Sequence, residues 1–309
     1  MKLLTPLLVL AALVSSAPAM PPAADQVIPL WPEGVPNFKT GVGPEKDDNG
    51  WVTHIATPVL AVRHGAVDRP TGTAVVICPG GGYAGLARER EGVQYADWLA
   101  TLGVTSFILN NRVGDYGHPA PLQDVLRAIR IVRSRAAEFH VDPDRIGVMG
   151  SSAGGHLAAS AATLFADPAG KTGAALDAVS ARPDFAILMY PVITFEPPYA
   201  HAGSRENLIG KHPSPELVAH YSLDQQVTPQ TPPTLLIHTE DDTVVPVQNS
   251  ILFYEALIKA HVPADLYIFA HGPHGMAMRP NLGTASNWPT FAADWLRVQG
   301  FLDAPKPKN

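Results

Sequence analysis

A serine flanked by glycines is the first candidate for chemistry in this chain. Gly150, Ser152 and Gly154 form the pattern Gly-x-Ser-x-Gly, in which Ser152 alone has glycine two residues before and after it. An apolar run over 146–149 precedes the pattern, and a helix-forming run over 157–162 follows it. A serine on a sharp turn from strand to helix exposes its hydroxyl, and a Cβ at either flanking glycine would clash. The pattern therefore predicts that Ser152 is a nucleophile.

A serine hydroxyl needs a base to take its proton, and that base needs an acid to hold it in one tautomer. Asp242 follows the strand predicted over 234–239, and His274 follows the strand predicted over 265–269. The chain order Ser, acid, His, with each residue after a strand, is one that hydrolytic triads use. We therefore expect Ser152, Asp242 and His274 to meet at one edge of a sheet.

Two neighbouring acidic residues are alternatives to Asp242 as the acid of the predicted triad. Glu240 and Asp241 stand directly before Asp242. We favour Asp242, which lies three residues before Val245, where the next helix approaches. Any of the three acids could instead cap that helix.

The base has an alternative as well, because His271 lies in the same segment as His274. We favour His274, which is followed directly by Gly275. An ordinary histidine titrates near about 6.5, so it can act as a base at neutral pH. A histidine one helical turn after the serine, His156, is expected to pack or hydrogen-bond beneath the turn.

A glycine-rich segment follows a short apolar strand. Gly81 and Gly82 can bring backbone N–H groups close to a developing oxyanion, and the N–H of Ala153 would be a further donor. The segment over 80–85 also spells Gly-x-Gly-x-x-Gly, which is a dinucleotide-binding fingerprint. That interpretation needs an acid at the end of the next strand, and residues 109–112 are Leu-Asn-Asn-Arg.

Composition argues against several other classes of function. The net charge is −6 without a basic cluster, so a nucleic-acid-binding surface is not expected. Residues 170–172 read Gly-Lys-Thr, but Phe165 stands where a phosphate-binding loop needs glycine. The one cysteine, Cys78, and the lack of His-Glu-x-x-His leave no zinc-binding spacing. We therefore expect no nucleic-acid partner and no metal or organic cofactor.

Strands alternate with helices along most of the chain, which predicts an α/β fold with a mainly parallel sheet. Strands are predicted over 73–78, 104–109, 146–149, 185–190, 234–239 and 265–269, and helices over 91–102, 119–139, 247–261 and 287–298. Residues 51–62 are predicted to form an edge strand. Residues 192–230, rich in Pro, His and Ser, break the alternation and are predicted to form a small lid.

The helix over 119–139 has apolar residues at a spacing of 3.6 residues. Its arginines lie mostly off that apolar stripe, at positions Arg127, Arg130, Arg133 and Arg135. We expect them on a solvated face.

The amino terminus has the pattern of a targeting segment. Lys2 precedes an apolar run over 3–14, and Ala17-Pro18-Ala19 is a small-x-small cleavage site. The run is too short to span a bilayer, so residues 1–19 predict a cleavable secretory signal and a periplasmic or secreted protein without a stable membrane span. Residues 20–50 are predicted to form an extended arm lying on a single catalytic domain over 51–309.

These motifs together resemble the α/β-hydrolase superfamily, and more narrowly the exported carbohydrate esterases of the acetyl xylan esterase and feruloyl/acetyl esterase group. The similar segments are 30–36 (Trp-Pro-x-Gly-x-Pro), 79–83 (oxyanion loop), Leu122 and Asp124 with Arg130 and Arg133 (helix), 150–157 (nucleophile turn), 242–246 and 272–275. A departure is Asn110-Asn111-Arg112, where a Tyr-Arg pair is common in the group.

The resemblance implies an α/β-hydrolase fold, with an eight-stranded type of sheet, helices on both faces and a small lid. It also implies a serine esterase whose substrate is a small ester or an acetylated carbohydrate. Such an enzyme would hydrolyse O-acetyl groups on xylan-type polysaccharide or oligosaccharide through an acyl-enzyme. Tyr83, Tyr116 and Tyr190 could line its pocket or pack in the core.

Three rival functions remain open. A peptidase of the prolyl-oligopeptidase-like type shares the later motifs, but such peptidases usually carry a large gating domain for which this chain has no room. A general small-ester carboxylesterase would use the same residues. A non-catalytic binding module on this fold would typically have lost the serine or the histidine.

Overall fold

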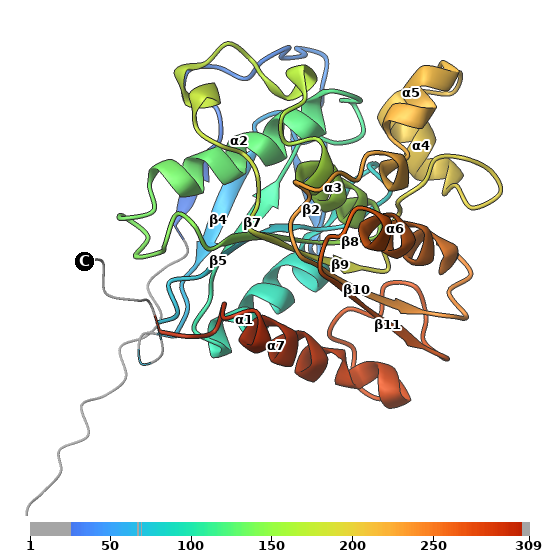
Figure 1. Ribbon diagram of the computed structural model, residues 1–309. Coiled ribbons are helices and arrows are strands. Elements are labelled where there is room, and N and C mark those ends of the chain that lie inside the picture. Colours follow the sequence, from blue (N-terminus) through green and yellow to red (C-terminus); the bar gives the residue numbers. More distant parts are fainter. Residues whose placement is uncertain (1–25, 67, 69, 305–309) are drawn as a thin grey trace, which may run out of the picture.

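An eight-stranded sheet runs through the molecule in the order β1-β4-β7-β5-β8-β9-β10-β11 (Figure 1). The computed structural model describes residues 26–66, 68 and 70–304, so the predicted secretory signal over 1–19 lies outside the described residues. The strands are β1 (Val27–Pro29), β4 (Val59–Arg63), β5 (Ala74–Cys78), β7 (Thr105–Asn110), β8 (Ile146–Ser151), β9 (Phe185–Met189), β10 (Thr234–Thr239) and β11 (Ala264–Phe269). Only the pairs β1–β4 and β4–β7 are antiparallel, so the sheet is mainly parallel, as predicted.

Helices cover both faces of this sheet (Figure 1). One face packs against α1 (Gln94–Thr101) and α7 (Trp288–Val298), and the other against α2 (Ala120–Ser134), α3 (Ser152–Thr163) and α6 (Gln248–Lys259). The strands β5, β7, β8, β9 and β10 are buried along their whole length. Because both faces are covered, these strands are nearly continuous apolar runs instead of alternating ones.

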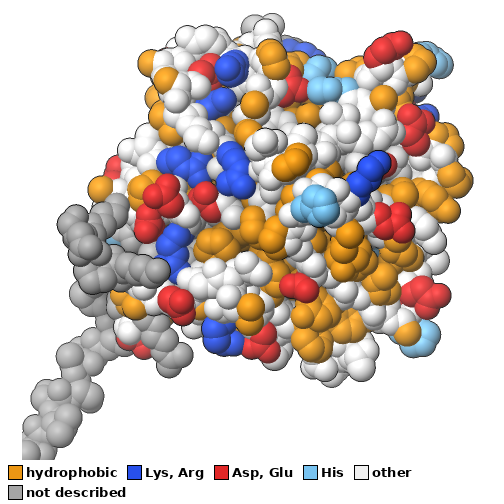
Figure 2. Space-filling view, viewed as in Figure 1, with side chains coloured by type: hydrophobic (Ala, Val, Ile, Leu, Met, Phe, Trp, Pro, Cys, Tyr) orange, Lys and Arg blue, Asp and Glu red, His pale blue; other side chains and the backbone are white. Residues whose placement is uncertain are grey.

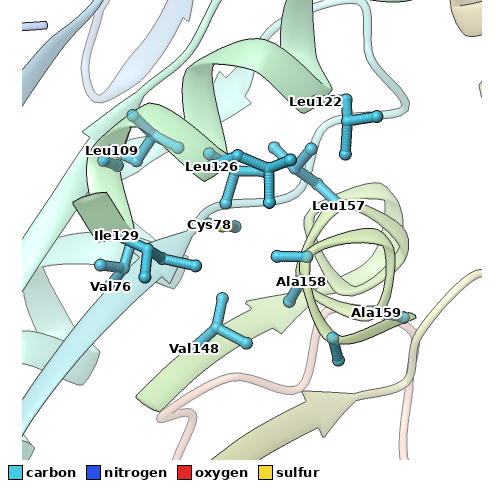
Figure 3. Close-up of a cluster of buried hydrophobic side chains, with 14 of the residues drawn as sticks. Val76, Cys78, Leu109, Leu122, Leu126, Ile129, Val148, Leu157, Ala158 and Ala159 are labelled. Atoms are coloured by element: carbon cyan, nitrogen blue, oxygen red, sulfur yellow. The ribbon is translucent and has the colours of Figure 1, made fainter. Parts of the chain in front are cut away.

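The larger core lies between the sheet and the pair α2 and α3. Figure 3 shows Val76 and Val148 of the central strands facing Leu126 and Ile129 of α2 and Ala158 of α3. This packing fixes where the central strands end relative to the helix that follows the nucleophile turn.

The prediction of an edge strand over 51–62 was wrong. Residues Trp51–Thr53 form β3 of a separate small sheet with β2 (Lys46–Asp48) and β6 (Leu86–Ala87), whereas β4 lies inside the large sheet. His54 adopts a left-handed φ of 57°, and the ring of Pro58 removes a backbone donor, so the chain breaks between the two strands. The edge strand beside β4 is β1, so the predicted extended arm contributes a strand to the domain.

The prediction of a solvated arginine face on α2 was wrong for three of its four arginines. They are largely buried in ion pairs: Arg127 with Glu33 at 2.6 Å, Arg130 with Asp177 at 3.0 Å and Arg133 with Asp184 at 3.0 Å. Their carboxylate partners come from the amino-terminal arm and from the segment before β9. Only Arg135, which pairs with Glu138, keeps a mainly surface position.

Residues 192–230 form two short helices, α4 (Ala202–Ile209) and α5 (Pro215–His220), and a 3-10 turn at Leu223–Gln225. In Figure 1 these helices stand to one side of α3. None of the helices in the described part of the chain is both long and apolar enough to cross a bilayer. The face in Figure 2 carries acidic and basic side chains close together, without a broad patch of either sign.

Candidate active site

Ser152 lies at the turn from β8 to α3, with a left-handed φ of 54°. Few residues other than glycine adopt this conformation, and it is a strained one that clusters at functional sites. A Cβ at Gly150 would lie 2.1 Å from the carbonyl oxygen of Gly154. A Cβ at Gly154 would lie 2.1 Å from the carbonyl oxygen of Cys78. Both glycines of the motif are therefore required by close backbone approach.

His274 connects Ser152 to Asp242. Its Nε2 atom lies 2.9 Å from Oγ of Ser152, and its Nδ1 atom lies 2.7 Å from Oδ2 of Asp242. Next to an ionised carboxylate, Nδ1 carries the proton and donates it, which leaves Nε2 free to accept the serine O–H. The structure thus brings together the three residues predicted from the sequence.

The Asp242 carboxylate is held by further donors. Its Oδ1 atom accepts the backbone N–H groups of Val244 at 2.9 Å and Val245 at 3.0 Å. Burial alone would raise the pKa of Asp242, but hydrogen bonds from His238 and His274 outweigh burial and hold that pKa below its usual value. Asp242 is therefore ionised at neutral pH.

The alternative residues lie away from the serine. Asp241 and His271 form their own pair, with Oδ2 and Nδ1 3.2 Å apart, and the His271 side chain is 89% exposed. The other carboxylate oxygen of Asp241 accepts the backbone N–H of Gly272 at 2.8 Å, so Asp241 anchors the loop that carries His274. Glu240 is exposed.

The glycine-rich loop after β5 lies directly against Ser152. A Cβ at Gly80 would lie 3.0 Å from Cβ of Ser152. Gly81 has a φ of +139°, and a Cβ there would lie 2.1 Å from the carbonyl oxygen of Gly85. Gly82 has a φ of +62°, and its carbonyl oxygen accepts a 2.8 Å hydrogen bond from Nδ2 of Asn207 on α4. The loop is therefore fixed between the nucleophile turn and the segment predicted to be a lid.

A profile of the family described as BD-FAE matches residues 65–257, which is more than half of the chain. The chain belongs to the BD-FAE family. The match includes the glycine loop, Ser152 and Asp242. This assignment agrees with the resemblance seen in the sequence motifs.

Known proteins similar to this BD-FAE chain include esterases and hydrolases. An acetylxylan esterase from Xylanibacter ruminicola is 36% identical over 212 residues, which are 67% of this chain and 42% of that protein. This chain therefore spans less than half the length of that relative.

Similar solved structures are covered over almost their whole length by this chain. An acetyl ester-xyloside bifunctional hydrolase from Caldicellulosiruptor lactoaceticus is 39% identical, with a TM-score of 0.79 over 90% of this chain and 97% of that one. An alpha/beta hydrolase from a deep-sea metagenome, 24% identical, has a TM-score of 0.62 over 90% of this chain and 98% of that one. The fold is that of the α/β-hydrolases, as predicted.

The three tyrosines considered as pocket residues are buried in this BD-FAE chain. Tyr83 hydrogen-bonds His156 at 2.9 Å, and the hydroxyl of Tyr116 accepts the backbone N–H of Lys39 at 3.0 Å. The ring of Tyr190 packs with its edge against His274, at 5.1 Å between centroids. All three therefore pack against or anchor neighbouring segments, and Tyr83 also lines a small cavity beside Gly80 and Ala153.

His156 hydrogen-bonds beneath the nucleophile turn, as predicted. Its Nε2 atom lies 2.9 Å from the carbonyl oxygen of Tyr221, so Nε2 carries the proton and Nδ1 accepts the Tyr83 O–H. The ring also stacks on Phe195 at 4.4 Å. Burial lowers the pKa of His156 to about 4. Neutral His156 thus joins α3, the glycine loop and the segment over 192–230.

Sequence reasoning missed two residues of this site, Glu91 and His238. His238 is the penultimate residue of β10, where its Nδ1 atom lies 2.7 Å from Oγ of Ser250 and its Nε2 atom lies 3.5 Å from Oδ2 of Asp242. A polar residue inside the apolar run of β10 was the available signal. Glu91 gave none, because it stands in a run of alternating charges that resembles a solvated helix start.

Proposed function

We propose that this protein is a serine esterase that removes O-acetyl groups from xylan-type polysaccharide or oligosaccharide. The observation that carries the proposal is the continuous hydrogen-bonded chain from Ser152 through His274 to Asp242. Two similar proteins, one named an acetylxylan esterase and the other an acetyl ester-xyloside hydrolase, support the substrate class.

In the first half of the reaction, Oγ of Ser152 attacks the carbonyl carbon of the ester. The serine proton moves to Nε2 of His274, and Asp242 stabilises the imidazolium that forms. When the tetrahedral intermediate collapses, the C–O bond to the sugar breaks and His274 gives its proton to the leaving oxygen. Ser152 is left as its acetyl ester.

In the second half, water attacks the acetyl carbonyl and gives a proton to His274. The bond between Oγ of Ser152 and the acetyl carbon breaks, and the proton on His274 returns to Oγ. Acetic acid leaves with the oxygen and the second proton of the water and ionises in solution, and the enzyme is restored. No metal or organic cofactor takes part in either half.

The tetrahedral intermediates carry a negatively charged oxygen, which hydrogen-bond donors must stabilise. We assign the backbone N–H groups of Gly81, Gly82 and Ala153 to this role, because the glycine loop lies against Ser152 and Ala153 follows it on α3. One such donor is worth about 100-fold to 1,000-fold in kcat in comparable sites.

The location and the lid belong to the same proposal. The pattern over 1–19 favours export, which would bring the enzyme to a polysaccharide outside the cytoplasm. Residues 192–230 would act as a small lid over the acyl site, supported by the hydrogen bond from Asn207 to the glycine loop.

The test compares purified protein on four substrates: acetylated xylan, feruloylated arabinoxylan, 4-nitrophenyl acetate and a 4-nitroanilide peptide. Acetate release from xylan with little release of ferulate and no amide cleavage is expected. Hydrolysis of nitrophenyl acetate alone would identify a general carboxylesterase, and cleavage of the anilide would identify a peptidase. No reaction with any substrate would favour a non-catalytic binding module.

A further inference from the structure

A buried carboxylate lies behind the candidate triad and has no part in the mechanism above. Glu91 lies in a π-helical turn over Glu89–Val93, directly before α1, and is only 5% exposed. Its Oε2 atom accepts the backbone N–H of Gly80 at 2.8 Å, and its Oε1 atom accepts the hydroxyl of Tyr190 at 2.9 Å. Single π-turns occur frequently at functional sites.

These two hydrogen bonds connect Glu91 to residues that contact Ser152 and His274. Gly80 begins the glycine loop and lies against Ser152. Tyr190 follows β9, and its ring packs on the imidazole of His274 at an angle of 71°. A Cβ at Gly275 would lie 3.8 Å from Oε1 of Glu91, so the segment that carries His274 also passes beside the carboxylate.

Two further hydrogen bonds link Tyr190 to Tyr95 and Tyr95 to Ser151. The hydroxyls of Tyr190 and Tyr95 are 3.1 Å apart, and the Tyr95 hydroxyl lies 3.0 Å from Oγ of Ser151, next to the nucleophile. Tyr190 donates to Glu91, so it accepts from Tyr95, which in turn accepts from Ser151. This order of donors and acceptors is the one that an ionised Glu91 imposes, because a carboxylate can only accept.

The charged and titratable groups around Glu91 are Tyr95 of α1, Tyr190, His274 and the adjacent Arg90. Burial raises the pKa of Glu91, and the hydrogen bonds from Tyr190 and Gly80 oppose that rise. The tyrosines are neutral at working pH. The charges that Glu91 meets are therefore that of Arg90 and the positive charge that His274 acquires during the reaction.

We propose that Glu91 is a positioning residue of the esterase, which holds the glycine loop and the His274 segment together and whose negative charge stabilises the imidazolium of His274. The inference rests on the proposed function, because it assigns Glu91 a part in the same reaction. Asp242 contacts one ring nitrogen of His274, and Glu91 supplies a second negative charge near the segment that carries His274.

The test compares Glu91→Gln with Glu89→Gln, a matched change at an exposed position of the same π-turn. Glu91→Gln should lower kcat by about 10-fold or more, because small displacements of catalytic groups reduce rates strongly. KM should change little, because Glu91 does not contact the substrate. The acid limb of the kcat/KM profile should move to lower pH, because His274 holds its proton less strongly without the neighbouring charge. Glu89→Gln should match the parent in kcat, KM and pH profile.

An acid limb that stays in place in a folded Glu91→Gln protein would overturn the proposal, whether or not kcat falls. If that variant does not fold, Tyr190→Phe decides, since it keeps the ring and removes one hydrogen bond to the carboxylate. A lower kcat and a smaller shift of the limb in the same direction are expected, and parent behaviour would overturn the proposal.

The pH dependence of fluorophosphonate labelling of Ser152 separates this inference from the proposed function. A parent protein that hydrolyses no ester refutes the esterase assignment. The labelling rate still measures activation of Ser152 by His274, so it tests Glu91 without any ester. A labelling profile that Glu91→Gln shifts to lower pH supports the inference, and an unshifted profile overturns it.

Discussion

Oδ2 of Asp242 lies 2.7 Å from Nδ1 of His274, and the two residues follow neighbouring parallel strands, β10 and β11. Parallel strands end at the same edge of a sheet, so two short loops suffice to bring acid and base together. Asp241, one residue earlier, pairs with His271 at the surface instead. A one-residue difference along one loop therefore separates the carboxylate that we propose as the catalytic acid from a loop anchor.

Asp242→Asn should reduce kcat by about 10,000-fold, because the amide cannot stabilise the imidazolium and favours the wrong tautomer of His274. Asp241→Asn is the matched control, and it should keep kcat near that of the parent. Initial rates on 4-nitrophenyl acetate measure both. A loss of similar size in the two variants would contradict the assignment of the acid.

Gly81→Ala and Gly82→Ala should differ sharply in stability. A Cβ at Gly81 would lie 2.1 Å from the carbonyl oxygen of Gly85, whereas one at Gly82 would meet nothing within 4 Å. Gly82→Ala should lower the free energy of unfolding by about 1–2 kcal/mol, from its left-handed backbone alone. Gly81→Ala should lower it by more or fail to fold. Urea titrations measure the difference. Equal midpoints for the two variants would contradict the prediction and show that the loop can shift to accommodate a Cβ at Gly81.

Asp124 should be essential for stability, because it neutralises a buried guanidinium. It contacts Arg112 at 2.8 Å and also accepts the indole N–H of Trp31 at 2.8 Å. Asp124→Ala should lower the free energy of unfolding by about 3–5 kcal/mol, since it leaves Arg112 buried and unpaired. Glu138→Ala, which removes the exposed partner of Arg135, should lower it far less, because exposed ion pairs contribute little to stability. Similar losses of unfolding free energy in the two variants would contradict this prediction.

His156 should make stability fall on the acid side. Its pKa is lowered from 6.5 to about 4 in the folded protein, so the unfolded chain binds more protons between these values. The free energy of unfolding should therefore decrease as the pH falls from about 6.5 toward 4, by up to about 1.4 kcal/mol per pH unit. In His156→Gln this contribution disappears, so the difference between urea midpoints at pH 7.5 and pH 5 should shrink. A variant with the parent's pH dependence would show that His156 is not the group responsible.

The sequence was most informative where chemistry and backbone geometry demand one residue type. Ser152 and its glycines could be predicted because only glycine fits the close approaches at the turn. The strand β10 has the predicted bounds, because a buried parallel strand needs an apolar run.

The rest depended on long-range packing. The edge position of β4 was mispredicted because β1, a three-residue strand, carries almost no local signal. Arg127 and Arg130 were placed in solvent because their carboxylate partners lie far along the chain. Glu91 was missed for the same reason, since its role depends on Gly80 and Tyr190 rather than on its neighbours in sequence.

The most direct test of the central claim is the rate of 4-nitrophenyl acetate hydrolysis by Ser152→Ala, with folding checked by thermal melting. We expect kcat to fall by about a million-fold, because the alanine side chain has no hydroxyl to attack the ester. A folded Ser152→Ala protein that keeps the parent's rate would contradict the assignment of Ser152 as the nucleophile.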